Sequence, residues 1–205
     1  MCGLIGYIGN EPAVSILLGA LERLEYRGYD SAGIATIDNG KVFVGKDKGK
    51  LADVMRECNI TSLPGRVGIG HVRWATHGGV TRENAHPHCD NKEQIAVIHN
   101  GIIDNYLEIR SRLSRKYRFV SETDTEVIPH LIREYMDSGA SFEDAFFKAI
   151  KELRGSYAVL AVSTVEPDKI LAARNESPLV IGLGENANYI GSDVLSWLIS
   201  RSLAL

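Results

Sequence analysis

The segment 2–9, CGLIGYIG, directly follows the initiator methionine and combines apolar residues with repeated glycines. This pattern predicts a strand whose missing side chains let another backbone or a ligand approach closely. From Glu11 the period changes, and Pro12 suits a first helical turn. The apolar residues then recur at helical spacing: Val14, Leu17, Leu18, Leu21 and Leu24. An amphipathic helix therefore follows the strand.

Strands and helices are mixed along the rest of the chain. Further strands are predicted at 32–37, 41–45, 67–72, 95–99, 157–163, 169–173, 179–183 and 189–191. Helices are predicted at 50–58 and 104–116, after a capping box formed by Thr123 and Glu126, and from Ser141. A long polar and glycine-rich stretch, 73–93, is typical of a functional loop. This order favours an α+β layered domain over a doubly wound parallel sheet.

Composition excludes several classes of protein. The 205 residues carry 23 Lys and Arg against 26 Asp and Glu, a net charge of −3, which argues against general nucleic-acid binding. No apolar run approaches the roughly 18 residues of a membrane span, and no signal-peptide pattern opens the chain. We therefore expect one cytoplasmic domain without a membrane partner. Cys2, Cys58 and Cys89 cannot all pair within one chain, so reduced thiols are expected.

Cys2 is a candidate nucleophile. If Met1 is removed, the chain begins with a thiol and a free α-amine on one residue. An α-amine titrates near pH 7.7 to 8.0, so it can take the thiol proton directly or through water. The alternative is a buried cysteine that packs as a small apolar group.

Three further motifs carry polar groups suited to binding. In GHVRWATHGG, residues 70–79, Arg73 can bind a carboxylate through two parallel hydrogen bonds, although it could equally be a solvated charge. In HNGIIDNY, residues 99–106, two donors can point at one oxygen, although Asn-Gly alone is more often a turn. In SETDTE, residues 121–126, an acidic residue can pair with an ammonium or simply favour a helix start.

Metal and nucleotide sites are not expected. HPHCD at 86–90 gathers several ligand types but lacks the spacing of recognised zinc sites. Neither GxGxxG nor GxxxxGK[ST] follows a strand and opens a helix, so no phosphate cradle is implied. We therefore expect no metal and no cofactor.

The combination of motifs resembles the class II glutamine amidotransferases, which are N-terminal nucleophile hydrolases. The resemblance rests on five segments that occur in the family's order: Cys2-Gly3, 26–33, 73–78, 99–101 and Thr123-Asp124. It covers nearly the whole chain and implies a four-layer αββα sandwich over residues 1–205. L-Glutamine is the substrate that it implies.

The resemblance also implies a role for each matching residue. Cys2 attacks the side-chain amide of glutamine, while Asn100 and Gly101 stabilise the oxyanion. The remaining assignments concern substrate binding and support: Arg73 binds the α-carboxylate, Asp124 the α-ammonium, Thr76 and His77 complete the pocket, Trp74 lies on a loop that closes over it, and Arg27 supports the nucleophile.

Within this class, RWATHG and HNGII look most like the glutaminase domain of glucosamine-6-phosphate synthases. Those enzymes continue into two sugar-isomerase domains that bind fructose 6-phosphate, which this chain lacks, and a homo-oligomer could form through them. Two alternatives stay open. One is the glutaminase domain of another class II amidotransferase, and the other is a catalytically silent ammonia-gating or regulatory subunit.

Overall fold

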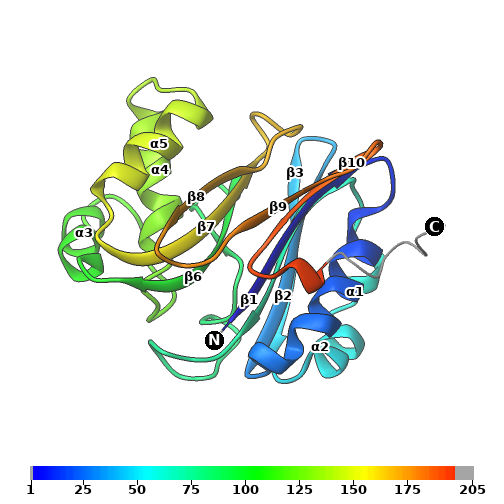
Figure 1. Ribbon diagram of the computed structural model, residues 1–205. Coiled ribbons are helices and arrows are strands. Elements are labelled where there is room, and N and C mark those ends of the chain that lie inside the picture. The colour runs from blue at the N-terminus through cyan, green and yellow to red at the C-terminus, as the bar shows by residue number, and fades with distance from the viewer. Residues whose placement is uncertain (1, 197–205) are drawn as a thin grey trace.

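Two antiparallel sheets form the centre of the computed structural model, which describes residues 2–196 (Figure 1). The larger sheet has six strands in the order β3-β2-β4-β1-β10-β9. Its strands are β1 (Gly3–Gly9), β2 (Ser31–Asp38), β3 (Lys41–Lys48), β4 (Val67–Arg73), β9 (Val180–Leu183) and β10 (Ala187–Gly191). The glycine-rich first strand is central in this sheet, between β4 and β10.

The smaller sheet has four strands in the order β5-β6-β7-β8. These are β5 (His88–Cys89), β6 (Ile95–Ile103), β7 (Gly155–Ser163) and β8 (Leu171–Asn175). On β6, Ile95 and Val97 pack toward the helices, whereas Ala96 and Ile98 pack toward the other sheet. Because side chains alternate across a strand, a sheet covered on both faces needs such an uninterrupted apolar run.

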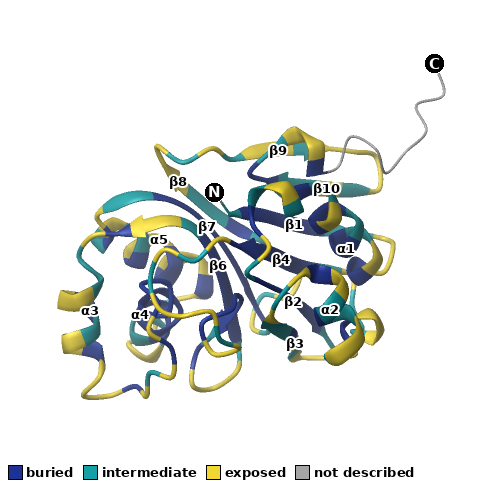
Figure 2. Ribbon diagram, turned by 90° about the horizontal axis from the view of Figure 1, so that it is seen from below, coloured by how far each residue is buried: buried dark blue, intermediate teal, exposed yellow. Residues whose placement is uncertain are grey.

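Helices cover the outer face of each sheet. Beside the larger sheet lie α1 (Ala13–Leu24), the short helix η1 (Glu25–Arg27), α2 (Leu51–Glu57), η2 (Ile60–Ser62) and η3 (Val194–Ser196). Over the smaller sheet lie α3 (Tyr106–Leu113), α4 (Val127–Asp137) and α5 (Phe142–Glu152). A separate apolar layer, which includes Leu4, Ile69 and Leu160, joins the two sheets. The predicted four-layer αββα sandwich is thus confirmed, and Figure 2 shows the buried strands between the more exposed helices.

Several boundaries differ from those predicted from the sequence. The strand predicted at 95–99 continues to Ile103 as β6, so Asn100 and Gly101 lie inside a strand rather than where one gives way to a helix. The short strand β5 interrupts the loop predicted at 73–93. No helix in the described range 2–196 has the length and apolarity to cross a membrane.

The predicted capping box at the start of α4 does not form. The helix begins as expected at Val127, but no side chain caps it. The Glu126 carboxylate instead accepts hydrogen bonds from the backbone N–H groups of Val120 and Ser121, at 2.8 and 2.7 Å. The Glu126 carboxylate therefore holds the loop before α4 and is not available to form a capping box. Ser141, in contrast, caps α5 by accepting from the N–H of Asp144 at 3.1 Å.

We expect Gly33→Ala to destabilise the fold. An added Cβ at this position on β2 would collide with the backbone oxygen of His86, because the 73–93 loop crosses β2 at that point. Overpacking of this kind costs typically about 1–3 kcal/mol. Gly19→Ala in α1 is the matched control, since its Cβ meets nothing closer than Arg23 at 3.6 Å. Chemical denaturation measures both, and equal stability of the two variants would contradict the expected close approach.

Candidate active site

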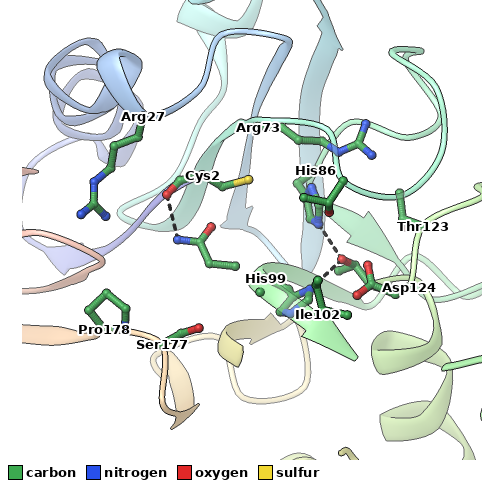
Figure 3. Close-up of a pocket in the computed structure, with 14 residues that line it drawn as sticks. Cys2, Arg27, Arg73, His86, His99, Ile102, Thr123, Asp124, Ser177 and Pro178 are labelled. Atoms are coloured by element: carbon green, nitrogen blue, oxygen red, sulfur yellow. Dashed lines mark hydrogen bonds between the residues drawn. The ribbon is translucent and has the colours of Figure 1, made fainter. Parts of the chain in front are cut away.

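A cavity of about 220 Å³ opens where β1, β4 and β6 come together (Figure 3). It is smaller than the roughly 300–1,000 Å³ of pockets for drug-sized ligands, which suits a small metabolite. Most of the site residues predicted from the sequence line it: Cys2, Arg27, Arg73, Thr76, Asn100, Gly101 and Asp124. Segments far apart in the sequence therefore contribute to one site.

Cys2 lies immediately before β1, at one wall of the cavity. Since β1 pairs with β4 and sets Gly3 opposite Val72, the thiol comes next to the end of β4. The Trp74 backbone N–H donates to Cys2 Sγ at 3.2 Å. Burial raises the pKa of the thiol, although the Trp74 N–H acts in the opposite direction. The thiol therefore needs a base to become a nucleophile near neutral pH.

Arg73 supplies a buried positive charge at the end of β4. Its side chain donates to two backbone oxygens of the following loop, those of His77 and of Gly79, the latter at 3.2 Å. Burial lowers the pKa of the guanidinium, while the nearby Cys2 and Asp124 oppose that shift. Because a guanidinium carries five N–H donors, donors remain for a ligand carboxylate.

Asp124 supplies the buried negative charge. It precedes α4, and its Oδ2 accepts a hydrogen bond from the backbone N–H of Ile103 at 2.8 Å. The other carboxylate oxygen has no hydrogen-bond partner among residues 2–196, so it is free to accept from a ligand. Figure 3 shows Asp124 across the cavity from Cys2.

Asn100 and Gly101 lie beside Cys2 on β6. The Asn100 Nδ2 donates to the Cys2 backbone oxygen at 3.1 Å, and its Oδ1 accepts from His71 Nε2 at 2.9 Å. Gly101 has a φ of 118°, in the region that favours glycine, and an added Cβ would collide with the backbone oxygen of Ser156. Only glycine therefore fits this strand position next to the cavity.

The remaining predicted residues have different surroundings. Thr76 lines the cavity and Arg27 does so at its edge, where Arg27 forms an ion pair with Asp193 at 3.3 Å. Trp74 is 45% exposed and packs edge-on against Tyr29 outside the cavity. The His77 side chain packs against Tyr106, while its backbone oxygen holds Arg73.

Several residues at the cavity were not predicted as site residues. They are His86, His99, Ile102, Thr123, Thr125, Ser177 and Pro178. Thr125 lies beside Asp124, and its hydroxyl bonds to His86 Nε2 at 2.8 Å and to His99 Nδ1 at 2.9 Å. The proximity of Thr125 to Asp124 in the sequence was the only available signal for it. Across residues 2–196, no group of three or more His, Cys, Asp or Glu side chains is arranged to hold a metal ion.

Comparison with known proteins assigns the chain to a family. The family described as "Glutamine amidotransferase domain" matches residues 71–197. The chain belongs to this family. Its match includes Arg73, Asn100 and Asp124, and it confirms the resemblance to the glutamine amidotransferases.

The chain is also similar to longer curated proteins. It is 54% identical to the glutamine–fructose-6-phosphate aminotransferase (isomerizing) of Methanothermobacter thermautotrophicus over 95% of this chain. It is 49% identical to the protein of the same name from Pyrococcus horikoshii over 97% of this chain. The chain spans 33% of the length of each of these relatives.

A solved structure supports the same fold. The glutamine phosphoribosylpyrophosphate amidotransferase of B. subtilis, complexed with ADP and GMP, superposes with a TM-score of 0.82 at 29% identity. The match covers 95% of this chain and 42% of that of the B. subtilis protein.

We expect Arg73→Ala and Asp124→Ala to weaken the use of glutamine. Each change removes one of two buried charges, and loss of a buried charge partner costs about 3–5 kcal/mol. That loss is expected mainly as a higher KM, measured as glutamate release over a range of glutamine concentrations. Arg112→Ala is a matched control, because Arg112 is a half-exposed arginine on α3 with ion-pair partners of its own. An unchanged KM in both cavity variants would contradict the assigned roles.

Proposed function

We propose that this chain hydrolyses L-glutamine to L-glutamate and ammonia through a thioester on Cys2. The observation that carries the proposal is one small cavity that holds a thiol, a buried guanidinium and a buried carboxylate. The two charges match the two charges of an amino-acid head group. The thiol then lies where the side chain of the bound amino acid can reach it.

In the proposed complex, Arg73 binds the α-carboxylate of glutamine and Asp124 binds the α-ammonium. Both side chains are almost fully buried, at 3% and 4% exposed, so their charges act with little screening by water. Each is also fixed by hydrogen bonds to backbone groups. The substrate is thus oriented by groups that need little rearrangement when it binds.

The chemistry begins with transfer of the Cys2 thiol proton to the α-amine of the same residue. The sulfur attacks the side-chain amide carbon and forms a tetrahedral intermediate. When the carbon–nitrogen bond breaks, the α-ammonium returns a proton and ammonia leaves. Water, activated by the same amine, then hydrolyses the thioester to glutamate and regenerates the thiol.

The negative oxygen of the tetrahedral intermediate needs hydrogen-bond donors that are already in place. We assign this role to the side-chain amide of Asn100 and the backbone N–H of Gly101. The support is that Asn100 Nδ2 already lies beside Cys2, 3.1 Å from its carbonyl oxygen. Loss of one such donor costs typically about 10²–10³ in kcat.

The whole protein is proposed to be a glucosamine-6-phosphate synthase, in which residues 1–205 form the glutaminase domain. Ammonia would then be transferred to fructose 6-phosphate bound by sugar-isomerase domains. The support is the 54% identity to a glutamine–fructose-6-phosphate aminotransferase (isomerizing), against 29% to the phosphoribosylpyrophosphate amidotransferase. Residues 1–205 assayed by themselves should release ammonia and form no amino sugar from fructose 6-phosphate.

Cys2→Ala is expected to abolish glutamate release, because no other group in the cavity can form the thioester. Cys58→Ala is the matched control, since Cys58 follows α2 and lies outside the cavity. Thermal unfolding should be measured to check that both variants are folded. Glutamate release at the normal rate by a verified Cys2→Ala protein would contradict the proposed mechanism.

Removal of Met1, which lies outside the described residues, is expected to be required, since only then does Cys2 have a free α-amine. Intact-mass measurement gives the processed fraction, and glutamate release should scale with it. A chain carrying an uncleaved N-terminal tag should be inactive, whereas a C-terminal tag should leave activity unchanged. Full activity of the N-terminally tagged chain would exclude the amine as the base. Retained Met1 without release in the untagged chain would favour a silent subunit.

A further inference from the structure

Four buried histidines lie around and behind the cavity: His71, His86, His88 and His99, none more than 5% exposed. The His71 and His86 rings are 4.2 Å apart between centroids, and those of His86 and His88 are 4.8 Å apart. The mechanism above uses none of them. His71 is distinct because its partner is Asn100, the proposed oxyanion donor.

His71 is neutral and has a defined tautomer. Burial lowers the pKa of His71 to about 3, so the ring carries a single N–H at any ordinary pH. The Asn100 Oδ1 can only accept a hydrogen bond, so the proton must be on His71 Nε2, 2.9 Å away. The other ring nitrogen, Nδ1, is buried and makes no regular hydrogen bond among the described residues, although the nearby His99 backbone also favours a protonated ring.

This arrangement determines which way the Asn100 amide points. Rotating the amide by half a turn would bring its oxygen against the Cys2 carbonyl oxygen and its NH₂ against the His71 N–H. The first contact would place two hydrogen-bond acceptors together, and the second would place two donors together. Moving the His71 proton to Nδ1 would relieve the second contact but not the first, because the amide oxygen would still face the Cys2 carbonyl oxygen. The amide NH₂ is therefore held on the side of Cys2.

We propose that His71 is a positioning residue for the oxyanion site, acting by holding the Asn100 amide with its NH₂ directed toward Cys2. The proposal rests on the oxyanion role of Asn100 given under Proposed function. His71 lies on β4 behind Asn100 and does not line the cavity, so it touches no bound substrate. Its effect should therefore appear in kcat, while KM, set by Arg73 and Asp124, stays unchanged.

The test uses two substitutions of His71 in the processed chain. His71→Leu removes the donor while filling a similar volume, and His71→Gln can return an amide N–H near the position of Nε2. Because a full oxyanion donor is worth about 10²–10³ in kcat, we expect His71→Leu to lower kcat by about 10- to 100-fold. KM should change by less than about twofold, and His71→Gln should recover most of the lost kcat.

A double-mutant cycle separates positioning from general packing. If His71 acts through Asn100, His71→Leu should lower kcat no further once Asn100→Ala is present. His130→Leu is the matched control, because His130 is also fully buried but packs between Tyr117 and Phe119 in the helical layer. It should leave kcat unchanged even if the unfolding temperature falls.

Three outcomes would overturn the proposal, and they are distinguishable. An equal fall in kcat from His71→Leu with and without Asn100→Ala would mean that His71 acts by another route. Unchanged kcat in His71→Leu, with Asn100→Ala impaired, would refute positioning and leave the oxyanion assignment intact. Full kcat in Asn100→Ala would refute the oxyanion assignment itself, and this proposal with it, while leaving the Cys2 nucleophile untouched.

Discussion

The antiparallel pairing of β1 with β4 is the constraint on which the site depends. It sets Gly3 opposite Val72, so Cys2 and Arg73 lie at the same end of the larger sheet. The next backbone N–H after Arg73, that of Trp74, then reaches the sulfur. A shift of this pairing by one residue would turn alternate side chains to the opposite face and separate the thiol from the guanidinium. The glycines of β1 permit the close approach of its neighbours.

The second sheet completes the site because the two sheets share an apolar layer. Leu4 on β1 and Ile98 on β6 both belong to that layer, so packing brings β6 against the larger sheet just beside Cys2. Beyond Ile98 the same strand continues as His99, Asn100 and Gly101. The inter-sheet layer thus changes from apolar to polar at one end. The cavity lies at that change.

Burying so many polar groups costs less free energy when each side chain makes at least one hydrogen bond. Arg73 and Asp124 each bond to backbone groups, and the buried histidines bond to Thr125, Thr123 and Asn100. Lowered pKa values keep His71, His86, His88 and His99 neutral, which avoids several like charges in one apolar region. The polar end of the inter-sheet layer is therefore a hydrogen-bonded network, and it supports the groups that face the ligand.

The sequence by itself determined the strand-then-helix opening, the layered α+β class and the residue types of the site, because these depend on local periodicity and on short motifs. It did not predict that β6 runs through Asn100 and Gly101, nor that Glu126 would close a loop instead of capping α4. Nor did it reveal the contact of His71 with Asn100, 29 residues apart, or that of His86 with Thr125, 39 residues apart. Only the tertiary structure decided these, because the extent of β6 depends on its pairing with β7, the Glu126 contact depends on the path of the loop before α4, and the two histidine contacts depend on how segments distant in the sequence pack.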